Sequence, residues 1–178
     1  PGRRAAIVVL NALLGLPAVV VGLAVYLLLS RAGPLGVFGI LFTPAAMVVA
    51  QAILVFPLLA ALTRQLVADA WSESREQLQS LGAGTGASAL ALLFDLRFTL
   101  VTVVLAGFGR AIAEVGAVMI VGGNIDGVTR VMTTAIALET SKGDLPLALG
   151  LGIVLLALVL ALTIVAHLVK ESAQRRHG

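Results

Sequence analysis

The sequence predicts an all-α membrane protein. Of its 178 residues, 60% are hydrophobic and 12% are charged, and the mean hydropathy is +1.09. A soluble domain has about 45–50% apolar and about 25% charged residues. The apolar residues collect in runs, and a spanning helix needs about 20 of them in succession. We therefore expect one transmembrane domain over residues 1–178, with about four spanning helices.

The composition also excludes several kinds of chemistry. The chain has no cysteine, which excludes disulfides, thiol catalysis and cysteine metal sites. It contains no His-Glu-x-x-His zinc motif and no convincing serine–histidine set. The net charge of +3 is too small to indicate nucleic-acid binding. We expect a non-catalytic protein of the lipid bilayer that binds no cofactor, no metal and no nucleic acid.

The first apolar run, residues 5–29, is slightly longer than one span. It is either a single tilted span or a short interfacial helix up to Leu14, followed by a span from about Leu16. Pro17 favours a bend between the two parts. Turn residues fill positions 30–39.

A second span is expected over residues 43–62, followed by the main polar segment, residues 63–92. Helical spacing in that segment, interrupted by the run Gly82-x-Gly84-x-Gly86, predicts a helix, a turn and a second helix outside the hydrocarbon. The glycine run lacks both the Lys-Ser/Thr that follows and the strand that precedes a phosphate-binding loop. Nucleotide binding by this chain is therefore not expected.

The second half of the chain is expected to contain two further spans. The third runs from residue 95 to about residue 121, and the fourth from 146 to 168. Between them lie a loop over 124–130 and a short helix over 131–139.

Charged residues inside the third span mark the candidate functional stretch. A charge within a span costs about 2.5–3.5 kcal/mol on insertion scales, so such residues are usually paired or line a polar cavity. Arg110 and Glu114 are four residues apart, close enough to pair on one helix face. The pair either lines or gates a path through the membrane, or neutralises itself and holds the helix to a neighbour. The second interpretation is favoured because buried charges are usually paired.

Neutral donors beyond this pair are the other candidates for a pathway. Hydroxyl and N–H groups can bind a passing ion weakly enough to release it. Thr133 and Thr134 could instead hydrogen-bond their own helix backbone, and both interpretations remain open. The candidate residues for a pathway or gate are Arg110, Glu114, Gly122, Gly123, Asn124, Thr129, Thr133 and Thr134.

The distribution of positive charge predicts the orientation, because basic residues favour the cytoplasmic side. With the N-terminus inside, Arg31, Arg130 and Lys142 lie outside, and Arg110 lies within the membrane. All the remaining basic residues then lie inside: Arg3, Arg4, Arg64, Arg75, Arg97, Lys170, Arg175 and Arg176.

Two motifs resemble those of ATP-binding cassette (ABC) importer permeases. Glu76, Gly82 and Leu92 have the spacing of the cytoplasmic loop of that family, although Gln77 and Leu78 replace its two alanines. The stretch from Gly109 to Thr134 resembles oxyanion permeases, and its residues are most similar to those of the tungstate type. The resemblance covers residues 1–169. It implies a type I ABC importer permease-like helix bundle that lacks one N-terminal spanning helix here.

The resemblance also implies partners and a role. It implies a homodimer in the inner membrane of a prokaryote, importing an oxyanion, most specifically tungstate, with ATP hydrolysed by a separate subunit. A periplasmic or lipid-anchored binding protein would deliver the anion. The ATPase would dock on a coupling helix at about residues 82–91, and the docking-loop residues are Glu76, Gly82, Gly84, Gly86 and Leu92. The alternative is an ATP-independent anion channel or secondary transporter.

Overall fold

The computed structural model describes residues 2–177, apart from the side chains at positions 3, 4, 6, 169, 170 and 172–177. Over this range the chain is helical and forms no strand, which confirms the predicted all-α class. The elements in order are α1 (Gly2–Leu14), α2 (Ala18–Leu29), the short 3-10 helix η1 (Gly36–Phe38), α3 (Pro44–Ser80), α4 (Thr85–Asp95), α5 (Arg97–Ile112), α6 (Gly116–Gly122), α7 (Met132–Lys142) and α8 (Leu145–His177).

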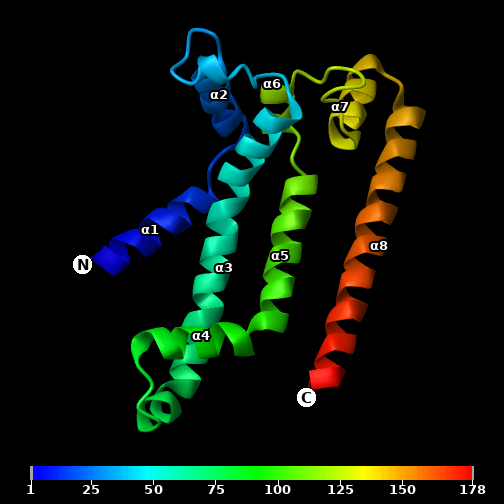
Figure 1. Cartoon of the computed structure of the whole chain (residues 1–178). Helices are drawn as coiled ribbons and strands as arrows, with labels where there is room; N and C mark the ends of the chain where they lie inside the picture. Colours follow the sequence, from blue (N-terminus) through cyan, green and yellow to red (C-terminus); the bar gives the residue numbers. More distant parts are fainter. Residues whose placement is uncertain (1, 178) are drawn as a thin grey trace.

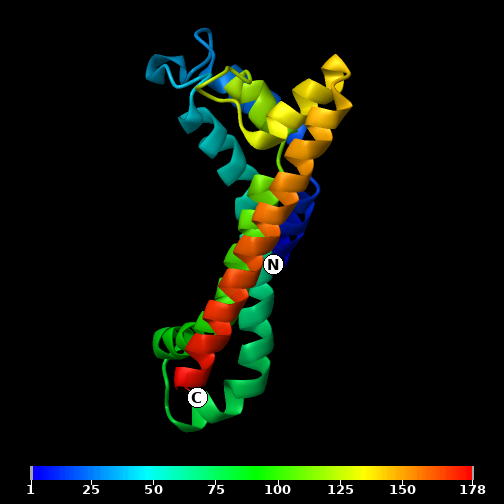
Figure 2. The ribbon, with the colours of Figure 1, turned by 90° about the vertical axis from the view of Figure 1, so that its right-hand side faces the viewer.

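Three long helices set the shape of the molecule. Helices α3, α5 and α8 extend along its length, with α5 in contact with both of the others (Figure 1). Helices α2, α6 and α7 gather at one end, and α4 lies crosswise at the other. Figure 2 shows the same division, with the C-terminus at the α4 end. The molecule therefore has two distinct ends joined by long helices.

The N-terminal apolar run forms two helices rather than one tilted span. Residues Ile7–Leu14 and Ala18–Leu29 meet at an angle of 99°. Pro17 stands at the N-cap of α2 with φ −65°, a position where its missing N–H costs no helix hydrogen bond. The structure therefore agrees with the interpretation in which a short helix is followed, after a bend, by a second helix.

Helix α3 is longer than expected. The predicted span ended at residue 62, whereas the structure continues one helix of 37 residues through to Ser80. Residues 63–80 contain no glycine and no proline, the two residues that most disfavour a helix interior. The helix ends before Gly82, whose φ of +67° lies in the left-handed region that commonly terminates helices.

The predicted third span is broken in the structure. Residues 95–121 were expected to form one helix, but α5 ends at Ile112 and α6 begins at Gly116. At its other end, α5 meets α4 at a bend of 70°. Helix α5 has only 16 residues, fewer than the roughly 20 that a complete span needs.

By length and composition, two helices of the described chain could each cross a membrane, or up to four if each bent pair counts as one span. This agrees with the expectation of about four spans. The final candidate, Leu145–Leu168, has only 6% of its apolar window buried within the chain. An apolar helix so little covered by its own chain suits contact with lipid or with another apolar protein surface.

The buried core lies where α2, α3 and α6 meet, at the end opposite α4. Ten buried residues form it: Val21, Val25, Leu29, Ala46, Met47, Ala50, Leu54, Ala117, Val118 and Val121. Helices α2 and α6 approach closely because Gly22 has no side chain: a Cβ there would lie 2.7 Å from the Cα of Ala117. Small residues allow such close crossings in membrane helices. The core thus fixes α6, and with it the break before it.

Candidate functional site

Glu114 stands in the break between α5 and α6 and is 4% exposed. Its Oε2 lies 2.7 Å from Nη1 of Arg110, so the predicted pair forms although α5 has already ended. Its Oε1 accepts a hydrogen bond from the backbone N–H of Ala117 at 3.0 Å. Ala117 lies in the first turn of α6, where N–H groups have no partner within the helix. One carboxylate therefore pairs with a guanidinium and caps a helix.

This hydrogen bond is consistent with the break in the third span. In an unbroken helix the N–H of Ala117 would donate to the carbonyl of Ala113. Here the side chain of Glu114 takes that N–H instead, so the backbone can leave the helix over residues 113–115 without orphaning the donor. The sequence pattern shows the spacing of the charges but not this competition.

Side chains from two other helices bond the carbonyl groups at the break. Gln51 of α3 donates from Nε2 to the Ala111 carbonyl at 3.0 Å. Thr133 of α7 donates from Oγ1 to the Glu114 carbonyl at 3.3 Å. Within a membrane, lipid offers no such partners, so irregular backbone must be bonded by protein or line a cavity. We call the side chains of Gln51, Arg110, Glu114 and Thr133 the polar joint.

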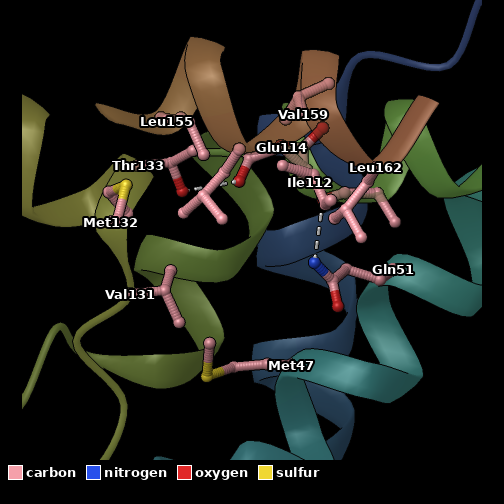
Figure 3. Close-up of a pocket in the computed structure, with 12 residues that line it drawn as sticks. Met47, Gln51, Ile112, Glu114, Val131, Met132, Thr133, Leu155, Val159 and Leu162 are labelled. Carbon is pink, nitrogen blue, oxygen red and sulfur yellow. Dashed lines mark hydrogen bonds between the residues drawn. The ribbon is translucent and has the colours of Figure 1, made fainter. Parts of the chain in front are cut away.

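A pocket of about 340 Å³ lies beside the polar joint, between α3, α7 and α8. Figure 3 shows Gln51, Glu114 and Thr133 on its wall, facing apolar side chains of α8 that include Leu155 and Val159. The lining residues include a carboxylate and no cation. With no cation in its lining, this pocket does not suit an oxyanion.

The turn after α6 contains four of the predicted pathway residues. Gly122 ends the helix, and Gly123 (φ +70°) and Asn124 (φ +50°) reverse the chain in left-handed conformations. Thr129 closes the turn: its Oγ1 donates to the Gly122 carbonyl at 2.6 Å and accepts from the N–H of Ile125 at 2.9 Å. The Oδ1 atom of Asn124 is buried and has no hydrogen-bond partner among the described residues.

The two threonines at the start of α7 are both buried and both bonded to backbone. Oγ1 of Thr134 accepts from the N–H of Val131 and donates to its carbonyl, each at 3.0 Å. Thr133 instead bonds across to Glu114 in the polar joint. The alternative of a bond to local helix backbone thus holds for Thr134, whereas Thr133 joins two elements. In this structure the hydroxyls of Thr129, Thr133 and Thr134 all have backbone partners.

The predicted docking-loop residues lie together at the α4 end. Glu76 is exposed near the end of α3, Gly82 and Gly84 form the turn, and Gly86 is in the first turn of α4. The helix occupies Thr85–Asp95 rather than the expected residues 82–91, because Gly82 is left-handed and Gly84 is the extended N-cap. Leu92 is buried, so it anchors α4 to its own chain.

The outer side of α4 carries large apolar side chains. Leu90 is 71% exposed, and Leu93 and Phe94 on the same helix are exposed as well. Leu81, at the end of α3 before the turn, is also exposed. We call these four residues the α4 apolar face. Exposed apolar groups of this kind commonly mark a contact with another protein.

Arg97 holds the bend between α4 and α5, a role that the sequence analysis did not predict. Its guanidinium lies over the rings of Phe94 and Phe98, at 4.1 and 4.5 Å from their centres. Its Nη1 also donates to the Phe94 carbonyl at 2.7 Å. These contacts join the last turn of α4 to the first turn of α5 and so favour one geometry of the bend.

Gln51 was also missed, although the sequence carried a signal for it. It is the one amide in the otherwise apolar run over residues 43–62, and polar side chains in a span usually bond to another helix. No group of three or more His, Cys, Asp or Glu residues in the described part of the chain could hold a metal ion.

The sequence of the chain is similar to those of several known transport proteins. The chain is 48% identical over 163 residues to the tungstate uptake system permease protein TupB of Peptoclostridium acidaminophilum, covering 92% of this chain and 72% of that protein. It is 40% identical to a probable anion ABC transporter permease protein of Haloferax volcanii, covering 99% and 78%. A TupB protein of Campylobacter jejuni is 40% identical, covering 89% and 66%.

No protein-family model matches the chain, and no solved structure gives a significant match. The identity and coverage of the relatives nevertheless decide the assignment. The chain belongs to the family of anion ABC transporter permeases that includes the tungstate uptake permeases.

Proposed function

We propose that this chain is the transmembrane subunit of an ABC importer that moves tungstate into the cell. The observation that carries the proposal is the 48% identity, over 92% of the chain, to a tungstate uptake permease. The residues from Gly109 to Thr134, which resemble the tungstate type, support the same substrate. The exposed apolar surface of α8 supports a place in the bilayer.

The energy for transport comes from a separate ATPase subunit that docks on the α4 apolar face. Two features support this contact. The face is exposed, and it lies at the end of the molecule that the distribution of positive charge assigns to the cytoplasm. The chain itself has no phosphate-binding loop, since the run Gly82-x-Gly84-x-Gly86 lacks the following lysine and follows a helix.

Two further partners complete the importer. A second copy of the chain forms a homodimer in the inner membrane of a prokaryote. A periplasmic or lipid-anchored protein captures the anion and delivers it to the end where α2, α6 and α7 gather.

Uptake by reconstituted liposomes tests the importer directly. The permease, its ATPase and the binding protein should accumulate tungstate only when ATP is supplied on the ATPase side. Omitting the ATPase should abolish uptake. Uptake by the permease alone would instead support an ATP-independent channel or secondary transporter.

A substitution on α4 tests the docking surface. Replacing Leu90 with Ser removes an exposed apolar contact, so binding of the ATPase and ATP-driven uptake should both fall several-fold. Val37 is 89% exposed at the opposite end, and a Val37→Ser variant is the matched control that should retain ATPase binding. Normal ATPase binding by Leu90→Ser would contradict the assignment of this face.

The identity of the anion is tested on the binding protein, because it captures the substrate first. Titration should give much tighter binding of tungstate than of sulfate. Molybdate binding as tight as tungstate binding would broaden the substrate to both oxyanions, and equal affinity for sulfate would overturn the tungstate assignment.

A further inference from the structure

We propose that Glu114 is a positioning residue that couples the two ends of the permease, and that the Arg110–Glu114 pair does not contact the anion. The inference rests on the proposed importer function. It assigns the polar joint a mechanical role: a movement of α4, imposed by the ATPase, reaches α6 and α7 through this joint.

The contacts of Glu114 connect the elements that must move together. Its carboxylate binds Arg110 on α5 and caps α6, and its carbonyl accepts from Thr133 on α7. Helix α5 leads directly to α4 through the bend at Arg97. Glu114 is thus the residue through which a displacement of α5 is transmitted to both α6 and α7.

Helix α3 contacts the chain on both sides of the polar joint. Gln51 holds the Ala111 carbonyl of α5 at 3.0 Å, just before the break. Because α3 also packs against α6 in the core, α5 and α6 are each held to α3 on their own side of the break. A change in the polar joint would therefore alter the positions of α5 and α6 relative to α3.

The geometry argues against a direct role of the pair in anion binding. The two side chains are 2.7 Å apart and neutralise each other, so they offer little net charge to an anion. The carboxylate also lines the adjacent pocket, where no cation is present. An anion that entered there would face the negative partner of the pair.

A charge-neutral double variant separates the two roles. Arg110→Gln alone leaves a buried carboxylate without its cation, which strongly disturbs a buried site. We expect this variant to lose most tungstate uptake while its ATPase still hydrolyses ATP. In the double variant Arg110→Gln/Glu114→Gln, two neutral amides can bond to each other and the glutamine oxygen can still cap α6. This variant should recover uptake, with the apparent KM for tungstate unchanged.

The opposite outcome identifies an anion contact. If Arg110 binds tungstate, the double variant will be as inactive as the single one, or will show a raised KM. That result overturns the proposal, and so does wild-type coupling in Arg110→Gln. The readout is the number of tungstate ions taken up per ATP hydrolysed, together with the KM.

A second comparison keeps the test valid if Arg110→Gln does not fold. Glu114→Gln retains an acceptor for the N–H of Ala117, whereas Glu114→Ala does not. We expect uptake per ATP to be higher for Glu114→Gln than for Glu114→Ala, and equal values would contradict the proposal. Asp126 and Arg130 form an exposed pair with the same sequence spacing, so Asp126→Asn is the matched control that should retain normal coupling.

These outcomes are distinct from a failure of the proposed function. If the wild-type permease shows no ATP-driven tungstate uptake, the importer assignment fails. If the wild type transports and the Glu114 variants remain fully coupled, only the role of the joint fails.

Discussion

Phe42 and Gly123 form a contact that both residues reach only in unusual backbone conformations. Both have positive φ, +63° and +70°, and the N–H of Phe42 donates to the Val121 carbonyl at 2.9 Å. A Cβ on Gly123 would lie 2.8 Å from the ring of Phe42. Left-handed backbone is rare for residues with side chains, so this contact fixes how the start of α3 meets the end of α6.

Gly123→Ala should therefore destabilise the protein more than a comparable glycine substitution does. The left-handed conformation alone costs alanine about 1–2 kcal/mol, and overpacking against Phe42 adds about 1–3 kcal/mol. Gly127 is also left-handed, with φ +69°, but a Cβ there meets nothing within 4 Å. Melting temperatures in detergent should be lowest for Gly123→Ala, with Gly127→Ala between it and the wild type. Equal melting temperatures would show that the ring of Phe42 moves aside freely.

At the residue scale, the sequence predicted partners better than it predicted conformations. The four-residue spacing of Arg110 and Glu114 was enough to predict their pairing. The cap that Glu114 places on α6 depends on where the chain bends, which spacing alone does not specify. Phe42 carried no signal, because a positive φ at a phenylalanine arises from tertiary contacts and not from local preference.

The crossing of α2 and α6 brings two helix backbones into close contact. It rests on Gly22, whose missing side chain lets the backbone of Ala117 approach. The sequence analysis did not predict this crossing, because it did not identify Gly22 and Ala117 as partners. The two residues lie almost a hundred positions apart in the chain, and a single sequence carries no sign of such a pairing.

A bulky residue at this crossing should separate α2 from α6. Gly22→Leu must displace the backbone of α6, so we expect a lower melting temperature and loss of ATP-driven uptake. Gly152 on α8 has nothing within 4 Å of its Cβ position, so Gly152→Leu should leave the melting temperature of the monomer almost unchanged. A stable, active Gly22→Leu protein would show that this crossing is not needed for the fold.

Element types were predicted better than element boundaries. The bend at Pro17 and the final span follow directly from proline chemistry and apolar length. The length of α3 was underestimated because a change from apolar to polar composition marks the edge of hydrocarbon, not the end of a helix. The break in the third span was missed because an apolar run of sufficient length hides it.

The orientation that the basic residues predict for the whole molecule can be tested without removing any native thiol. Since the chain has no cysteine, single variants Leu81→Cys and Val37→Cys each carry one reactive group, and both positions are exposed. In intact cells a membrane-impermeant maleimide should label Val37→Cys and should label Leu81→Cys only after the cells are opened. Labelling of Leu81→Cys from outside would place α4 beyond the reach of a cytoplasmic ATPase.

The sequence predicted the general architecture of the molecule. It did not predict which residues far apart in the chain come into contact. Composition gave the membrane class, and the family resemblance gave the type of transporter. The polar joint brings together Gln51 of α3, Thr133 of α7 and Glu114 of the segment between α5 and α6, and only the folded chain places them side by side.

The length of α3 has a consequence for the proposed ATPase contact. A helix of 37 residues is about 55 Å long, and the hydrocarbon layer is about 30 Å thick. Roughly 25 Å of this helix can therefore project beyond the hydrocarbon core, which is more than the few ångströms occupied by each headgroup region. The α4 apolar face would then lie clear of the bilayer surface, where the proposed ATPase subunit could bind it without displacing lipid.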